Sequence, residues 1–138
     1  MKIRDFLDKG DYSNYRNVRA AAAMFVVLGA ILVLAGAGIS LIEPEPGHPG
    51  APKALGIVLM LVGAAGAVGG VAVFRANPRW SKLVYVMACL YVLAFPLGTI
   101  LSAVMFVGLA RYLNNVARFR EAAARPPIKA GFGTRARY

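Results

Sequence analysis

Hydrophobic residues are gathered into three long runs that contain no charged side chain. The runs extend from Ala20 to Ile42, from Ala54 to Phe74 and from Leu83 to Ala110. At about 1.5 Å per residue, each of the first two is long enough to cross a hydrocarbon core of about 30 Å as a helix. The segment between them, Glu43 to Lys53, includes four prolines and two glycines, which predicts a short exposed turn.

The third run fits either one strongly tilted helix or a hairpin of two short helices. Its 28 residues would form a helix of about 42 Å, whereas two halves would each reach only about 20 Å. Pro96 and Gly98 at the midpoint favour the hairpin, because proline removes a backbone donor and glycine permits a turn. We therefore expect an all-α membrane protein with four transmembrane helices, at about 20–42, 54–74, 81–95 and 98–113. The last is expected to continue as a cytoplasmic helix to about residue 125, where two prolines end it.

Basic residues are concentrated on one side of these predicted helices. Fifteen of the sixteen lie before the first run, between the second and third, or after the third, together with only four acidic residues. Lys and Arg accumulate on the cytoplasmic side of membrane proteins, so we expect both termini to be cytoplasmic and the proline-rich turn to face outward. A single helix across the third run would place the basic tail outside. We expect one transmembrane domain over residues 1–125, with an interfacial N-terminal segment, and a basic extended tail over 126–138.

Small residues recur at every seventh position in the first two predicted spans. Because membrane helices associate through close packing rather than hydrophobic burial, such stripes predict helix contacts. Two interpretations stay open: the stripes pack the first span against the second, or one stripe faces another protein. The stripes consist of Ala22, Gly29 and Gly36 in the first span and of Gly56, Gly63 and Gly70 in the second, where Gly66 is a further candidate packing residue.

The composition is typical of a membrane protein and not of a soluble domain. With 59% hydrophobic and 16% charged residues and a formal charge of +10, the chain has too few polar residues to cover a soluble domain. The first run continues past Ala35-Gly36-Ala37, so we expect it to be retained as a span rather than cleaved as a signal peptide. One cysteine and one histidine exclude an internal disulfide, a multi-cysteine metal site and paired-histidine haem ligation.

The predicted spans lack the residues that intramembrane chemistry requires. They contain no Asp, Glu or His, which argues against proton-coupled drug transport and histidine-ligated pigments. A phosphate-binding glycine loop, a nucleophile elbow and paired catalytic carboxylates are missing too, so we expect no enzymatic activity, cofactor or metal site. His48, near Glu43 and Glu45 in the proline-rich turn, is interpreted as solvated. Cys89 is interpreted as a packing residue and Thr99 as the cap of the last helix.

The segment Phe95-Pro96-Leu97-Gly98-Thr99-Ile100-Leu101 resembles a pattern in small uncharacterised bacterial inner-membrane proteins with four helices. In that group a Pro-Leu-Gly-Thr turn joins the last two helices. The resemblance covers about residues 83–113. It implies a bacterial inner (cytoplasmic) membrane and a hairpin whose turn contains Pro96, Gly98 and Thr99, and it implies no catalytic residues.

Basic residues after the third run are the remaining functional candidates. We expect them to contact larger membrane protein subunits or anionic lipid, and we expect no nucleic-acid binding because no recognisable module accompanies them. The leading hypothesis is a non-catalytic accessory subunit of a larger membrane complex, packed through the glycine-striped helices and the basic tails. The alternative is an independent homo-oligomer that binds or moves a small apolar molecule, a lipid or a peptide. The candidate contact residues are Arg111, Arg118, Arg120, Arg125, Lys129, Arg135 and Arg137.

Overall fold

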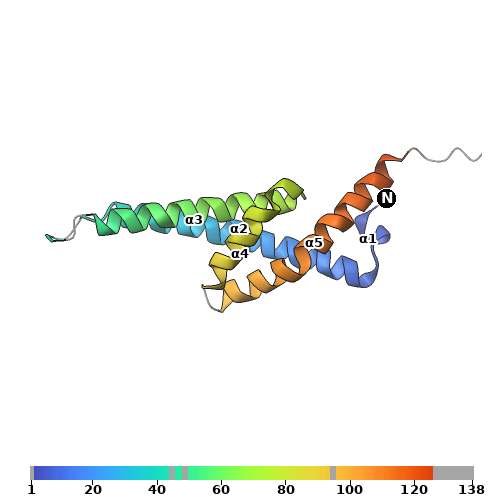
Figure 1. Cartoon of the computed structure of the whole chain (residues 1–138), viewed down its shortest axis with the longest axis horizontal. Helices are drawn as coiled ribbons and strands as arrows, with labels where there is room; N and C mark the ends of the chain where they lie inside the picture. The colour runs from blue at the N-terminus through green and yellow to red at the C-terminus, as the bar shows by residue number, and fades with distance from the viewer. Residues whose placement is uncertain (1, 44–45, 48–49, 94–95, 126–138) are drawn as a thin grey trace, which may run out of the picture.

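The computed structural model describes residues 2–43, 46–47, 50–93 and 96–125, and all its regular elements in these ranges are helical (Figure 1). Three helices are long and apolar enough to cross a membrane, namely α2, α3 and α5. The prediction of an all-helical chain with helices able to cross a membrane is thereby confirmed, and the fourth predicted span, at about 81–95, is not among these three helices. The elements are α1 (Ile3–Phe6), α2 (Lys9–Ser40), α3 (Ala51–Phe74), the 3₁₀ helix η1 (Pro78–Trp80), α4 (Ser81–Val92) and α5 (Leu97–Ala124).

Helices α2 and α3 form a long antiparallel hairpin whose backbones touch at glycines. A Cβ atom added to Gly29 would lie 2.5 Å from the carbonyl oxygen of Gly63, and one added to Gly36 would lie 2.5 Å from that of Gly56. The same holds at Gly70, where the added atom would lie 2.6 Å from the carbonyl oxygen of Ala22. The two small-residue stripes therefore face each other within the chain, and any side chain there would force the helices apart.

Helices α4 and α5 pack against one end of this hairpin. Phe25 of α2 and Tyr91 of α4 meet edge to face, with 4.8 Å between ring centroids, and Gly66 of α3 lies against the Tyr91 hydroxyl. The buried core lies here, around Val18, Met105 and other fully buried side chains. Figure 1 shows that the opposite half of the α2–α3 hairpin, formed by the C-terminal part of α2 and the N-terminal part of α3, has neither α4 nor α5 beside it. We call this part the isolated half of the hairpin.

Helix α2 begins at Lys9, well before the predicted start at about residue 20. The polar first turns are helical because they pack on α5. Asn14 Nδ2 donates to the carbonyl of Gly108 over 3.1 Å, and a Cβ atom at Gly108 would lie 2.7 Å from a methyl carbon of Val18. A glycine in α5 thus lets an amphipathic extension of α2 approach, which the search for uncharged runs could not detect.

Proline residues determine two other helix boundaries. Helix α3 starts at Ala51, three residues before the predicted position, with Pro52 in its first turn, where the missing N–H has no intrahelical acceptor. Helix α5 ends at Ala124, and Arg125 is extended, because a residue before proline disfavours the helical conformation. The predicted end at about residue 125 agrees with this boundary.

The connection between α4 and α5 differs from the predicted one. Helix α4 has 12 residues and ends at Val92, so its length is only about 18 Å. The prediction that Thr99 caps α5 is wrong: Pro96 occupies the N-cap position, and Thr99 Oγ1 donates to the carbonyl of Val92 over 3.2 Å. Gly98 is buried within the first turn of α5. Cys89 is exposed, so its interpretation as a packing residue is also wrong.

Candidate functional site

Three helices change from apolar to charged at the same end of the molecule. Arg19 immediately precedes the first apolar run, Arg75 follows the last residue of α3, and Arg111 follows the third run. We call this region the basic end: it comprises α1, the first turns of α2, the C-terminal end of α3 with η1, and the last turns of α5. A cavity of about 300 Å³ opens there between these elements.

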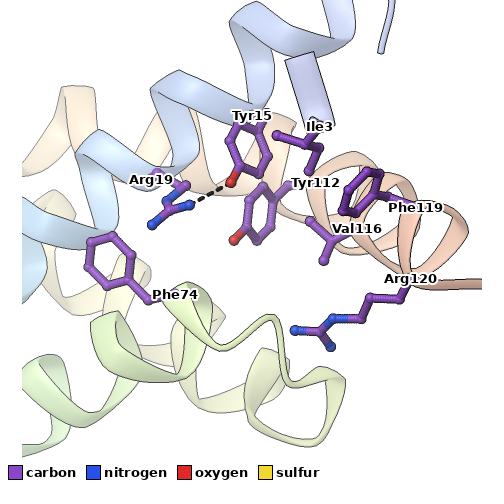
Figure 2. A pocket seen from close by; sticks show the side chains of 8 residues that line it. All are labelled: Ile3, Tyr15, Arg19, Phe74, Tyr112, Val116, Phe119 and Arg120. Carbon is purple, nitrogen blue, oxygen red and sulfur yellow. Dashed lines mark hydrogen bonds between the residues drawn. The ribbon is translucent and has the colours of Figure 1, made fainter. Parts of the chain in front are cut away.

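The cavity combines polar and apolar walls (Figure 2). Its polar groups are two guanidiniums and two phenols, from Arg19, Arg120, Tyr15 and Tyr112. Its apolar side chains are Ile3, Phe74, Val116 and Phe119. Helix α1 is held over this region by the edge-to-face contact of Phe6 with Phe119, whose ring centroids lie 5.6 Å apart. A binding site for a small amphipathic anion needs such a combination of donors and apolar surface.

Arg19 is held in place by aromatic rings. Its guanidinium carbon lies 5.4 Å from the ring centroid of Tyr15 and 5.3 Å from that of Phe74, and Nη1 donates to the Tyr15 hydroxyl over 2.5 Å. Tyr15 and Arg19 are four residues apart on α2, so they share one helix face. Arg19 was not among the functional residues predicted from the sequence. Its position four residues after a tyrosine and directly before an apolar run is the signal that could have indicated it.

Tyr112 and Arg120 of α5 bind the C-terminal end of α3. The Tyr112 hydroxyl donates to the carbonyl of Val73 over 2.9 Å, and Arg120 Nη2 donates to the carbonyl of Arg75 over 2.7 Å. The last carbonyls of an α-helix lack intrahelical partners and carry partial negative charge. These two side chains therefore provide hydrogen bonds to carbonyls at the end of α3, and they fix the position of α5 against it.

The other basic residues that the sequence analysis singled out have different surroundings. Arg111 Nε forms an ion pair with Asp11 Oδ1 over 2.5 Å. Arg118 lines a second cavity, of about 270 Å³, beside Asp8 and Asp11, and Arg125 is exposed just past α5. The candidates Lys129, Arg135 and Arg137, like His48 and Glu45 of the proline-rich turn, lie outside the described residues. Arg111 and Arg118 thus face carboxylates, whereas Arg120 shares a cavity with Arg19.

Other polar side chains within the helices make local hydrogen bonds. Ser102 of α5 is buried and donates to the carbonyl of Ala88 over 2.5 Å, which joins α5 to α4. Ser40 donates to the carbonyl of Gly36 on its own helix. Among the described residues, no three His, Cys, Asp or Glu side chains are grouped so that they could hold a metal ion.

Comparison of the chain with protein-family models, with curated proteins and with solved structures finds no match. Two features of the structure therefore bear on the function of this chain. One is the isolated half of the α2–α3 hairpin, and the other is the cavity at the basic end, whose guanidiniums and phenols supply hydrogen-bond donors to an anion.

Proposed function

We propose that this protein is a non-catalytic accessory subunit of a larger membrane protein complex in the bacterial inner membrane. The isolated half of the α2–α3 hairpin is the observation that carries this proposal (Figure 1). Leucines along it are strongly exposed: Leu34 is 72% exposed, Leu41 86% and Leu61 66%. Because the glycine stripes are occupied in joining α2 to α3, the surface offered to larger subunits is the outer, leucine-bearing face of this pair.

The proposed topology has four membrane-inserted helices with both termini in the cytoplasm. Helices α2 and α3 cross the membrane, and the basic end lies on the cytoplasmic side, in keeping with the positive-inside rule. The α4–α5 hairpin enters from that side and returns the chain to it. Tyr91, in the last turn of α4, packs on Gly66, which is eight residues before the end of α3, or about 12 Å along its axis. The turn of the hairpin is therefore expected inside the membrane.

The exposed cations of the basic end supply the cytoplasmic contacts of the proposed subunit. Arg125 lies exposed just past the end of α5, where it can contribute about 1 kcal/mol of attraction to an anionic surface. Arg118 contributes less, because Asp8 and Asp11 lie beside it. Arg111 also contributes less, because Asp11 offsets its charge. A partner subunit with an acidic cytoplasmic surface, or the anionic leaflet itself, fits this arrangement, and the segment 126–138 extends the same charge. Deleting 126–138 is expected to release the subunit at moderate salt.

Purification from the native membrane in a mild detergent, with mass spectrometry of co-migrating chains, tests the proposal. We expect stoichiometric larger subunits with the wild-type chain. A Leu34→Trp, Leu61→Trp variant should lose them while keeping its thermal stability in detergent, because both side chains point away from the fold. Leu93→Trp, at a position that is 84% exposed on the α4–α5 hairpin, is the matched control and should retain them. Recovery of the wild-type protein alone would overturn the accessory role.

The cavity at the basic end favours a second candidate function, that of an independent homo-oligomer which binds or moves a small apolar molecule, a lipid or a peptide. Its apolar wall, formed by Phe74, Val116 and their neighbours, would hold the apolar part of such a ligand. A single homo-oligomeric species that survives detergent with no other chain attached would favour this function over the accessory one.

A further inference from the structure

We propose that the cavity between Arg19 and Arg120 binds the phosphate group of an anionic lipid headgroup. The proposal rests on the topology above, in which the basic end lies at the cytoplasmic surface, but not on membership of a larger complex. Both charged side chains of the cavity are cationic, and the described residues that line it include no carboxylate. Arg111, by contrast, is offset by Asp11. The cavity therefore concentrates positive charge that an anion can offset.

The two guanidiniums retain donors for such an anion. Each guanidinium has five N–H donors in a planar fork that matches phosphate oxygens. The hydrogen bonds described above use one donor of Arg19, to the Tyr15 hydroxyl, and one of Arg120, to the carbonyl of Arg75. Neither acceptor carries a full charge, so these bonds orient the two side chains and leave most of their charge uncompensated. In Figure 2 both guanidiniums point inward, on either side of the Tyr112 hydroxyl.

The position of the cavity along the helices identifies the source of the phosphate. Arg19 adjoins the first residue of an apolar run, Phe74 is the last residue of another, and Tyr112 lies two residues after the third. The cavity is therefore level with the boundary between hydrocarbon and headgroups, where arginine and aromatic side chains are favoured. A phosphate at this depth belongs to a phospholipid, whose acyl chains would continue along the apolar surface of the membrane helices.

The volume of the cavity fits a headgroup rather than a whole lipid. At about 300 Å³ it lies at the lower end of the range for small-molecule sites, about 300–1,000 Å³. Arg19 contributes most of the selectivity for an anionic headgroup, because its charged guanidinium is held in a fixed orientation against aromatic rings. Arg120 has a second role in binding the end of α3, and its substitution alone could weaken the fold.

Native mass spectrometry of the purified full-length chain, titrated with phosphatidylglycerol, tests the proposal. We expect phosphatidylglycerol to bind at least about tenfold more tightly than zwitterionic phosphatidylcholine, and Arg19→Gln to weaken its binding by at least about tenfold. Arg19→Gln leaves the bond between Arg120 and Arg75 in place, and its thermal unfolding in detergent verifies the fold. The matched control is Arg79→Gln, which removes an exposed cation of η1 outside the cavity and should change binding by less than about twofold.

Three results would overturn the assignment. Equal losses in Arg19→Gln and Arg79→Gln would mean diffuse surface attraction rather than a site. Equal binding of phosphatidylcholine would remove the requirement for an anionic headgroup. Displacement of the lipid by inorganic phosphate at equal concentration, with ionic strength held constant, would make free phosphate the ligand. Because the lipid titration uses the isolated chain, it can succeed or fail independently of the subunit co-purification.

Discussion

The hydroxyl of Tyr112 donates a hydrogen bond to the main-chain carbonyl of Val73, with 2.9 Å between the two oxygens. The phenol and the valine are both almost completely buried, so the bond is well shielded from water. Val73 also accepts from the N–H of Ala76, over 2.9 Å, in the left-handed turn that ends α3. The bond joins α5 to the end of α3 and sets the shape of the cavity beside it.

Tyr112→Phe is expected to destabilise the protein by about 1 kcal/mol, the net value of a buried hydrogen bond between neutral groups. The ring still fills its place, so packing changes little and the loss reports the hydroxyl alone. Thermal unfolding in detergent measures it. Tyr12→Phe, on a half-buried ring of α2, is the control and should leave the midpoint unchanged. An unchanged midpoint in Tyr112→Phe would show that the bond contributes nothing.

Tyr91→Phe is expected to change the stability of the protein in the opposite direction. The Tyr91 hydroxyl is buried, and no hydrogen-bond partner lies within reach in the part of the chain that the structure describes. A buried hydroxyl without a partner costs about 1–3 kcal/mol, so its removal should leave stability unchanged or raise it by about 1 kcal/mol. The same unfolding experiment compares the two tyrosines directly. A loss as large as that of Tyr112→Phe would mean that the Tyr91 hydroxyl has a partner.

The sequence predicted those helix boundaries that a residue close to the boundary marks. The end of α3 at Phe74 and the end of α5 just before Pro126 are both marked locally, by the first arginine in one case and by proline in the other. The start of α2 at Lys9 is not marked locally, because it depends on Asn14 and Val18 meeting Gly108, more than 80 residues away in the sequence. Tertiary packing there decides the conformation of a polar segment.

In the candidate site, too, some features can be predicted from the sequence and others depend on tertiary packing. The sequence places Arg120 at the correct end of the molecule, because charge asymmetry is read from the chain itself. It cannot tell that Arg120 shares a cavity with Arg19 while Arg111 pairs with Asp11. Those pairings depend on how α5 is rotated against α2, which Gly108 and Tyr112 determine through contacts with residues of other helices.

Gly29→Ala is expected to destabilise the protein by about 1–3 kcal/mol, the usual cost of overpacking a close contact. The added methyl carbon would meet the backbone of α3 at the Gly63 carbonyl, and backbone cannot move aside as a side chain does. Gly38→Ala, on the same helix, meets nothing within 4 Å and is the matched control. It should leave the unfolding midpoint unchanged or slightly higher, since alanine favours a helix over glycine. Equal effects at both positions would contradict the close α2–α3 contact.

Single cysteines in a Cys89→Ser background test the depth of the α4–α5 hairpin. In intact cells a membrane-impermeant maleimide should label Glu43→Cys, in the connection between α2 and α3, but not Ser13→Cys, which should react only after permeabilisation. Leu93→Cys should react slowly from both sides, because Leu93 follows α4, and the 12 residues of that helix reach only about 18 Å into a core of about 30 Å. Labelling of Leu93→Cys from outside as fast as Glu43→Cys would mean that the hairpin crosses the whole membrane. Labelling of Ser13→Cys without permeabilisation would reverse the proposed orientation.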